Sequence, residues 1–193
     1  MLALVLAGGD NTRYPTPKGL IAIGGRSIIQ RQIDMLNTLG LTPHVSTNTP
    51  DLYAGLGVPL IGDSVRRAGP VSGIISAFDA TGTPEMLVMA CDMPFIKPEM
   101  IQYIIEHRGG EATVPAPGGR PEPLLAVYTD KAAGKMRRAM EKGNSSMRGL
   151  LGLLEARLIH QDEICVIDPE GVSFVNINTP EDYRAALARQ PGT

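Results

Sequence analysis

Short apolar runs of strand length alternate along this chain with segments that have the periodicity of an amphipathic helix. Residues 86–91, for example, form a continuous apolar run of the kind found in strands that are buried on both faces. Strands and helices that alternate in this way favour an α/β fold, a three-layer α/β/α sandwich with a mostly parallel central sheet. We expect strands at residues 2–6, 44–47, 58–61, 86–91, 112–115, 124–128, 164–167 and 174–177.

The expected helices are marked by capping residues and apolar stripes. Ser27 followed by Gln30 fits a capping box, and Gly40 provides the stop. The stripe between them consists of Ile28, Ile29, Ile33, Leu36 and Leu39. Further helices are expected at 71–80, 98–107, 131–141, 147–155 and from 180 onwards with Thr179 as its cap. Residues 63–70 predict a polar loop, and the Pro/Gly-rich segment 115–123 predicts a flexible surface loop.

Length and charge narrow the class of protein. A chain of 193 residues without an internal repeat or a low-complexity linker predicts a single domain over residues 1–193. The net charge of −2 gives no reason to expect nucleic acid as a partner, and the apolar run at 2–6 is too short to cross a membrane. Two cysteines imply no disulfide framework, and we expect a cytoplasmic protein. Of the two, Cys91 ends an apolar run and is expected to be a small buried side chain rather than a nucleophile.

The first expected strand leads directly into a glycine-rich loop that carries two cations. Ala7-Gly8-Gly9 follows the strand, and Arg13 and Lys18 come next. Glycine lets backbone N–H groups approach an anion without an obstructing Cβ, and spaced cations neutralise a polyphosphate. The loop is therefore a candidate phosphate cradle. It contains neither G-x-G-x-x-G nor G-x-x-x-x-G-K-[ST], so neither a dinucleotide fold nor a Walker loop is indicated.

A carboxylate follows another expected strand. Asp92 comes directly after the run at 86–91, and ligands of open α/β sheets bind outside the carboxyl ends of the strands. A carboxylate beside a polyphosphate usually acts through a divalent metal, because two anions repel each other, and Mg²⁺ prefers oxygen ligands. Asp92 therefore predicts a Mg²⁺ site facing the glycine-rich loop. The alternative interpretation is that Asp92 only caps the following turn and that Lys18 is a solvated loop lysine.

Five segments of the chain occur in an order that is shared with one enzyme family. The first is LAGGDNTRYPTPK at residues 6–18, which is similar to a nucleotide-binding signature of L-A-G-G, three variable residues, R-M-G and a lysine. The others are GPVSG at 69–73, CDMPF at 91–95, EPLLAVY at 122–128 and NINTPED at 176–182. Together they resemble the molybdenum cofactor guanylyltransferases, the MobA family, over nearly the whole chain.

The resemblance implies a Rossmann-like α/β/α fold of the nucleotide-diphospho-sugar transferase type. It also implies transfer of GMP from GTP to molybdopterin that carries molybdenum, with Mg²⁺ as the cofactor and pyrophosphate as the second product. A terminal phosphate of the pterin would attack the α-phosphorus of GTP, so the protein needs no covalent nucleophile. Such a role would bring transient contacts with cofactor-biosynthesis or acceptor proteins.

Roles for individual residues of the first loop follow from the same resemblance. Contacts to the nucleotide, chiefly through the backbone, are implied for Leu6, Ala7, Gly8 and Gly9. Lys18 and Arg13 would hold the phosphates and stabilise the departing pyrophosphate. Asp92 would be the Mg²⁺ ligand.

Other site residues come from the later segments. Asp63 occupies the position of a nucleotide-contacting aspartate, and the alternative is a surface loop acid. Asn48 lies in a segment similar to an asparagine-containing stretch of the family, and Ser46 is its rival because an alignment shifted by two residues also fits. Asn176 and Asn178 would contact the pterin or the metal, or would only satisfy the loop backbone, and we favour the structural role.

The chain also departs from the family pattern. Tyr14-Pro15 replaces Met-Gly, and Pro17 precedes Lys18, so the loop should be stiffer and should donate fewer backbone hydrogen bonds. The alternatives to the guanylyltransferase are a molybdopterin cytidylyltransferase or sugar- or alditol-phosphate nucleotidyltransferase, a non-catalytic nucleotide-binding paralogue and, least favoured, an oxidoreductase. Gly9 favours guanine over cytosine, because the cytosine-specific relatives more often begin L-A-A-G or A-A-G.

Overall fold

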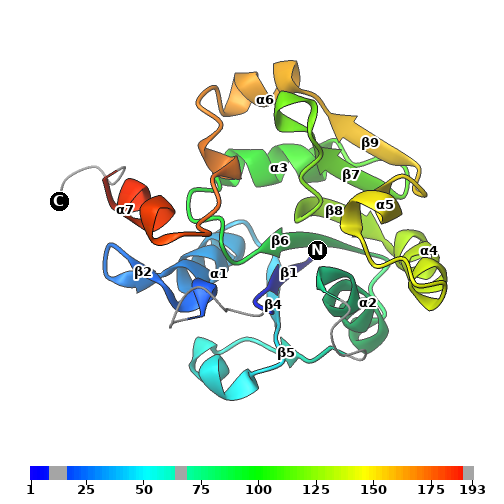
Figure 1. Ribbon diagram of the computed structural model, residues 1–193, viewed down its shortest axis with the longest axis horizontal. Coiled ribbons are helices and arrows are strands. Elements are labelled where there is room, and N and C mark those ends of the chain that lie inside the picture. The colour runs from blue at the N-terminus through cyan, green and yellow to red at the C-terminus, as the bar shows by residue number, and fades with distance from the viewer. Residues whose placement is uncertain (9–16, 64–68, 189–193) are drawn as a thin grey trace.

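The protein is built around a seven-stranded sheet with the strand order β5-β4-β1-β6-β8-β7-β9. The computed structural model describes residues 1–8, 17–63 and 69–188 (Figure 1). β8 runs antiparallel to its neighbours β6 and β7, and the other neighbouring pairs are parallel. The strands are β1 (Leu2–Leu6), β4 (Thr42–Ser46), β5 (Leu60–Ile61), β6 (Glu85–Ala90), β7 (Ala112–Pro115), β8 (Leu125–Thr129) and β9 (Ala156–Ile159).

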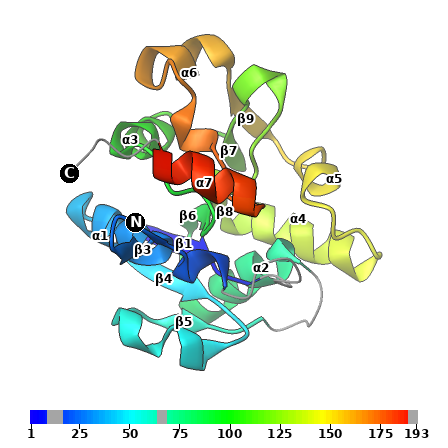
Figure 2. The same cartoon turned by 60° about the vertical axis from the view of Figure 1, so that its left-hand side comes forward.

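Helices cover both faces of this sheet, because side chains alternate between two apolar cores along each strand. Ala3 and Val5 of β1 belong to the core under α1, α3 and α6, whereas Leu4 and Leu6 belong to the core under α2, α4 and α5. In Figure 2 the strands run between α1 and α3 on one side and α2 and α4 on the other. The helices are α1 (Ile28–Thr38), α2 (Pro70–Thr81), α3 (Pro98–Glu106), α4 (Asp130–Glu141), α5 (Met147–Leu151) and α6 (Gln161–Ile167). The predicted three-layer α/β/α sandwich is confirmed.

A smaller apolar cluster lies outside the two main cores. The hairpin of β2 (Ala22–Ile23) and β3 (Arg26–Ser27) packs with the first residue of α1 and with α7 (Pro180–Ala188). Figures 1 and 2 both show α7 beside this hairpin. The C-terminal helix is thereby brought close to the segment that follows β1. The described residues also form short 3₁₀ turns at Lys18–Leu20, Pro50–Leu52, Ala54–Leu56, Pro117–Gly119 and Val172–Phe174.

Two strand predictions near the C-terminus are wrong. Residues 164–167 form the last turn of α6. Phe174 ends a 3₁₀ turn, and residues 175–177 form no strand. A four-residue apolar run fits a strand or a helix equally well, and here the capping box of His160 and Glu163 favours the helix. Only Ile164 of that run is buried, and Val166 is 84% exposed. The strand that forms in this region, β9, was not predicted. The helix α5 ends at Leu151 rather than at the expected residue 155.

Among residues 1–8, 17–63 and 69–188, no helix combines the length and apolar character needed to cross a membrane.

Asp168 ties the end of α6 to the segment between β6 and α3. Its side chain is fully buried; Oδ1 pairs with Lys97 Nζ at 3.0 Å, and Oδ2 accepts a hydrogen bond from Ser173 N at 2.7 Å. The Ser173 hydroxyl in turn accepts a hydrogen bond from Lys97 N. Burial acts to raise the pKa of Asp168, but the hydrogen bonds from Ser173 and Lys97 outweigh it and lower this pKa. An ion pair between a fully buried carboxylate and a partly exposed lysine therefore holds the segment that leads into α3.

We expect Asp168→Asn to destabilise the fold by about 2–3 kcal/mol, because Lys97 loses its buried partner. The pKa of Asp168 in the folded protein lies below its unfolded value of about 3.9, so its stabilising contribution is present above that pH and is lost as the pH falls below it. Denaturant unfolding at neutral and acidic pH measures both effects, and the variant should lose less stability on acidification. Asp79→Asn is the matched control, because Asp79 and Arg137 pair on the surface with side chains 46% and 42% exposed. Equal losses of stability in Asp168→Asn and Asp79→Asn would contradict a stabilising role for the Asp168–Lys97 pair.

Candidate active site

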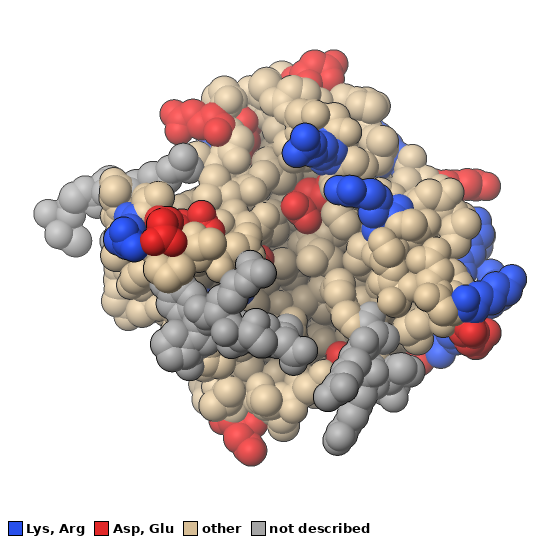
Figure 3. Space-filling model, in the orientation of Figure 1, with Lys and Arg blue, Asp and Glu red and all other residues tan. Residues whose placement is uncertain are grey.

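The carboxyl ends of four parallel strands meet at one edge of the sheet. β5, β4, β1 and β6 are consecutive neighbours, so Asp63, Ser46, Ala7 and Asp92 follow or end adjacent strands. Backbone hydrogen bonds continue past the strand ends and fix their spacing: Ala7 N donates to Ser46 O at 2.9 Å, and Cys91 N donates to Leu6 O at 3.1 Å. This edge is where open α/β sheets bind their ligands. In the face shown in Figure 3 the centre of the molecule is hollowed, and acidic atoms are visible in the wall of the hollow.

Lys18 lies between two oxygen atoms at this edge. Its Nζ is 3.0 Å from Asp92 Oδ2 and donates to Asn178 Oδ1 at 2.5 Å. The side chains of Lys18 and Asp92 are 29% and 19% exposed, so the pair is partly screened from water but open to a ligand. The structure therefore joins the predicted phosphate lysine, the predicted metal ligand and an asparagine from NINTPED at 176–182, the last segment of the resemblance.

The C-terminal segment is fastened to this group at two points. Ile177 N donates to Asp92 O at 2.9 Å, which places the following residue, Asn178, beside the Asp92 turn. Asp182 Oδ2 accepts hydrogen bonds from the backbone N–H groups of Asn178 and Thr179, both at 2.8 Å, and its own N–H donates to the Thr179 hydroxyl. Thr179 thus acts as the predicted cap of α7. These contacts hold the Asn178 backbone while its side chain remains directed at Lys18.

A second polar group lies on the other side of β1. Asn48 Nδ2 donates to Asp63 Oδ2 at 2.9 Å, Asn48 Oδ1 accepts from Asp63 N at 3.0 Å, and the Ser46 hydroxyl donates to Asp63 Oδ1 at 3.4 Å. Ser46 and Asn48 are therefore not exclusive alternatives, because both contact Asp63. The amide and carboxylate are oriented by each other and present a polar wall next to the end of β1.

Gly73 allows α2 to approach this second group closely. A Cβ at position 73 would lie 2.4 Å from Ser46 Oγ, 3.1 Å from Leu6 Cδ2 and 3.3 Å from Asp63 Oδ1. The first of these distances is shorter than any contact that a real Cβ tolerates. The second glycine of the GPVSG segment is thus needed for packing between α2 and the ends of β1 and β4, and it indirectly positions Ser46 and Asp63.

We expect Gly73→Ala to destabilise the protein by about 1–3 kcal/mol, because the methyl group displaces the Ser46 hydroxyl from Asp63. It should also weaken severalfold the nucleotide binding that the resemblance implies for Ser46 and Asp63. Denaturant unfolding and calorimetric titration with GTP measure the two effects. Gly134→Ala is the control: its Cβ would meet only Arg138 Nη1 at 3.9 Å, and alanine inside α4 should stabilise the helix by roughly 0.5–1 kcal/mol. Unchanged GTP affinity in Gly73→Ala would remove Ser46 and Asp63 from the nucleotide site.

Buried side chains support the edge from beneath. The Tyr53 hydroxyl donates to Ala7 O at 3.5 Å, and the residue is 1% exposed. Burial raises the pKa of Tyr53 to about 12, with the nearby Cys91 adding to the effect. Burial and the negative charge of Asp92 likewise raise the pKa of Cys91 to about 12, although the charge of Lys18 opposes the rise. Cys91 is therefore a buried, protonated thiol, as expected, and not a nucleophile.

Glu122 brings a second carboxylate to the neighbourhood of Asp92. Ala90 N donates to Leu124 O at 2.8 Å, which extends the antiparallel pairing of β6 and β8 towards the turns that carry Asp92 and Glu122. Burial raises the pKa of Glu122, a hydrogen bond from Leu124 N opposes the rise, and the negative charge of Asp92 adds to it. Sequence reasoning quoted Glu122 in the EPLLAVY segment but gave it no role, because only the sheet register reveals its position.

The predicted site residues divide into three groups. Lys18 and Asp92 meet directly, and Ser46, Asn48 and Asp63 meet on the other side of β1, with Leu6, Ala7 and Gly8 between the two groups. At Gly8, an added Cβ would meet no described atom within 4 Å, so space is open above the backbone there. Gly9 and Arg13 lie outside the described residues, as does Tyr14-Pro15. Sequence reasoning missed Tyr53 and the packing role of Gly73, and only the GPVSG segment gave a signal for one of them.

A divalent cation fits the chemistry of this edge. Asp92 Oδ2 and Asn178 Oδ1 already share one cation, the Lys18 ammonium, and carboxylate and amide oxygens are donors that suit Mg²⁺. Within the described part of the chain, no group of three or more His, Cys, Asp or Glu side chains could hold a metal ion. A Mg²⁺ ion would therefore take most of its ligands from substrate phosphates and water, which is its usual behaviour with nucleotides.

Several known proteins are similar to this chain in sequence and in architecture. The family described as MobA-like NTP transferase domain matches residues 3–161. The molybdenum cofactor guanylyltransferase of Desulfosudis oleivorans is 30% identical over 191 residues, which cover 96% of this chain and 93% of the relative. The crystal structure of molybdopterin-guanine dinucleotide biosynthesis protein A from Archaeoglobus fulgidus has a TM-score of 0.84 at 28% identity and covers 97% of each chain. Rv0371C of Mycobacterium tuberculosis, solved in complex with manganese, shares the fold at 17% identity with a TM-score of 0.72 over 98% of each chain.

Proposed function

This chain belongs to the MobA-like NTP transferase family and is a nucleotidyltransferase, and from this premise we propose that it transfers GMP from GTP to molybdopterin. The acceptor would carry molybdenum, and the products would be the guanine dinucleotide form of the cofactor and pyrophosphate. The observation that supports the proposal most is the meeting of Lys18, Asp92 and Asn178 beside the end of β1. A cation and two oxygen donors at one point suit a triphosphate that is bound together with a divalent metal.

The nucleotide would lie over the ends of β1 and β4. Among the described residues, Ala7 and Gly8 follow the end of β1, and a Cβ at position 8 would meet no described atom within 4 Å, so a ligand could approach the backbone there. Asp63, oriented by Asn48 and Ser46, would contact the nucleoside. Arg13 and Gly9 keep their predicted roles in holding the phosphates and the nucleotide.

Charge stabilisation would come from the other side of β1. Lys18 would move from Asp92 to the phosphates and neutralise the pyrophosphate as it leaves. We propose that Asp92, with Asn178, holds Mg²⁺, which supplies Lewis-acid stabilisation of the phosphates when it is bound. The terminal phosphate of the acceptor would approach the α-phosphorus from the open side, so the protein orients the reactants and needs no nucleophile of its own.

The cytoplasmic location expected from the sequence and the contacts with other cofactor-biosynthesis or acceptor proteins remain predictions.

Two measurements test the proposed function. Calorimetric titration of GTP, CTP, ATP and UTP in the presence of Mg²⁺ should give the tightest binding for GTP, and tighter binding of CTP would overturn the guanine assignment in favour of a cytidylyltransferase. Pyrophosphate release with GTP, Mg²⁺ and molybdopterin carrying molybdenum should then require all three components. Binding of GTP without any release of pyrophosphate would instead indicate a nucleotide-binding carrier or regulator.

A further inference from the structure

Gln32 is a polar residue within the apolar face of α1. It lies beside Ile33 and one turn after Ile28 and Ile29, and only 3% of its surface is exposed. An apolar residue at this position would complete the stripe of the helix, whereas a buried amide is destabilising unless its polar groups are hydrogen-bonded. Helix packing alone therefore does not explain a glutamine here.

The amide of Gln32 bridges the turn that carries Asp92. Its Nε2 donates to Ala90 O at 2.9 Å and to Met93 O at 3.1 Å. A single NH₂ group is thus bound to the carbonyl two residues before Asp92 and to the carbonyl one residue after it. Because both bonds are buried, they restrict the backbone on each side of the carboxylate without competition from water.

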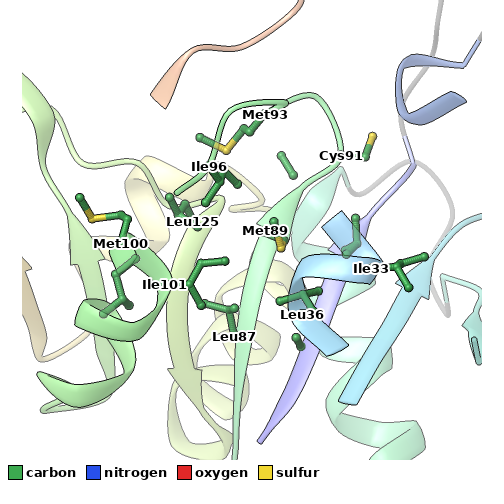
Figure 4. Packing of buried hydrophobic residues seen from close by; sticks show 14 of the residues in the cluster. Ile33, Leu36, Leu87, Met89, Cys91, Met93, Ile96, Met100, Ile101 and Leu125 are labelled. Carbon is green, nitrogen blue, oxygen red and sulfur yellow. The ribbon is translucent and has the colours of Figure 1, made fainter. Parts of the chain in front are cut away.

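The surroundings of the turn explain why this restraint has an effect at the site. Figure 4 shows Cys91 at the end of β6, with Met93 and Ile96 in the segment that continues over the core and Ile33 of α1 nearby. On the opposite side, Ile177 N donates to Asp92 O at 2.9 Å. The turn is therefore held from below by α1 and from the side by the C-terminal segment, and its carboxylate is left directed at Lys18.

Gln32 occupies this position although its amide oxygen lacks a hydrogen-bond donor among the described residues. Its Oε1 is buried and accepts no hydrogen bond from the described residues. Methionine has nearly the same length and volume and would fill the space without leaving a buried acceptor unpaired. A residue that breaks the local packing rule in this way is expected where the position serves a functional site.

We propose that Gln32 is a positioning residue for the nucleotidyl transfer. By binding the carbonyl groups of Ala90 and Met93, it holds the Asp92 carboxylate in the orientation in which that carboxylate shares a cation with Asn178. Gln32 does not touch the substrate and acts only through the backbone of the turn. The inference rests on the proposed function in one respect, the role of Asp92 as a ligand for a divalent cation.

The test compares Gln32→Met with the wild-type protein, using Mn²⁺ as the probe. Because the ion would take most of its ligands from phosphates and water, Mn²⁺ binding is measured by electron paramagnetic resonance with GTP present, against GTP alone as the reference. The affinity of the protein for Mn²⁺ should be lower on the order of tenfold in the variant, since groups that orient a metal ligand typically have effects of this size. Amide hydrogen exchange over residues 90–96 should be faster. In the pyrophosphate assay, the Mg²⁺ concentration for half-maximal activity should rise, while the KM for GTP at saturating Mg²⁺ should stay close to its wild-type value.

Two further variants separate positioning from a general loss of stability. Gln32→Leu also lacks the NH₂ group and should reproduce the Mn²⁺ effect if Gln32→Met is poorly folded. Met136→Ala, a fully buried position in α4 on the opposite face of the sheet, should lower the thermal midpoint without changing Mn²⁺ affinity. The inference is overturned if the Gln32 variants bind Mn²⁺ as the wild type does, or if Met136→Ala shows the same loss. If the wild type binds no Mn²⁺ even with GTP present, the role of Asp92 as a metal ligand is refuted, and the positioning role of Gln32 is refuted with it.

Discussion

Replacing Asp92 with asparagine should lower the rate of pyrophosphate release by roughly two to three orders of magnitude and leave the fold intact. The amide oxygen of asparagine can still accept a hydrogen bond from Lys18 Nζ, so the local contact at 3.0 Å keeps a partner. The negative charge, however, is lost, and with it the attraction for a divalent cation. Asp92 is 19% exposed and lies at the end of a strand rather than in the core, so we expect only a small change in the thermal midpoint.

The measurement is the rate at saturating GTP over a range of Mg²⁺ concentrations, together with a thermal unfolding curve. A higher Mg²⁺ concentration should not restore the rate of Asp92→Asn. Asp79→Asn makes the same chemical change in a surface ion pair and should keep wild-type activity. Near-normal turnover of Asp92→Asn would show that Asp92 only caps its turn, which is the alternative interpretation of the sequence.

The edge of the sheet that carries the site could be predicted because it depends on local patterns. Lys18 and Asp92 are 74 residues apart, yet each follows a buried apolar run, and parallel strands bring the ends of such runs to one side. Ser46, Asn48 and Asp63 were predicted from the resemblance to the family instead. Their mutual hydrogen bonds depend on β5, β4 and β1 being neighbours in that order, which the sequence does not state.

Asn178 shows where local reasoning stops. Its backbone N–H donates to Asp182, so the structural role favoured from the sequence, in which the Asn178 side chain satisfies the loop backbone, is filled by another residue. Its side chain nevertheless contacts Lys18, 160 residues away. This contact depends on the path of the chain after α6, a region where the sequence predicted two strands that the structure does not contain. A wrong secondary structure over residues 164–177 therefore concealed the approach of this segment to the site.

Gln32 was missed for a different reason. The apolar stripe expected for α1 consists of isoleucines and leucines, and Gln32 lies between them without a predicted role. In the structure it points into the core and binds two carbonyl groups at the end of β6. Polar residues at core positions of a predicted helix are thus candidates for support of a site, but their partners lie on elements that only the tertiary fold brings near.

Lys18→Met should reduce kcat/KM by on the order of a hundredfold, because one charge-assisted contact to the phosphates is lost where charge develops as pyrophosphate leaves. Methionine keeps the length of the side chain, so the packing of the 3₁₀ turn Lys18–Leu20 is preserved. Most of the loss should appear in kcat, since the lysine would act chiefly on the departing pyrophosphate, and steady-state kinetics at saturating Mg²⁺ separates this from a change in KM.

A closely matched control exists at the opposite edge of the sheet. Lys135 pairs with Glu111 at 2.7 Å, with side chains 35% and 13% exposed, which resembles the Lys18–Asp92 pair in both distance and burial. If ion pairing alone mattered, Lys135→Met and Lys18→Met would have the same consequences for stability and for activity. We expect instead that Lys135→Met keeps the wild-type kcat, because the charge of Lys135 stabilises only Glu111. Lys18→Met should lower kcat, because the charge of Lys18 must move from Asp92 to the substrate. An unchanged rate in Lys18→Met would show that its contact with Asp92 is structural and that the phosphates are neutralised elsewhere.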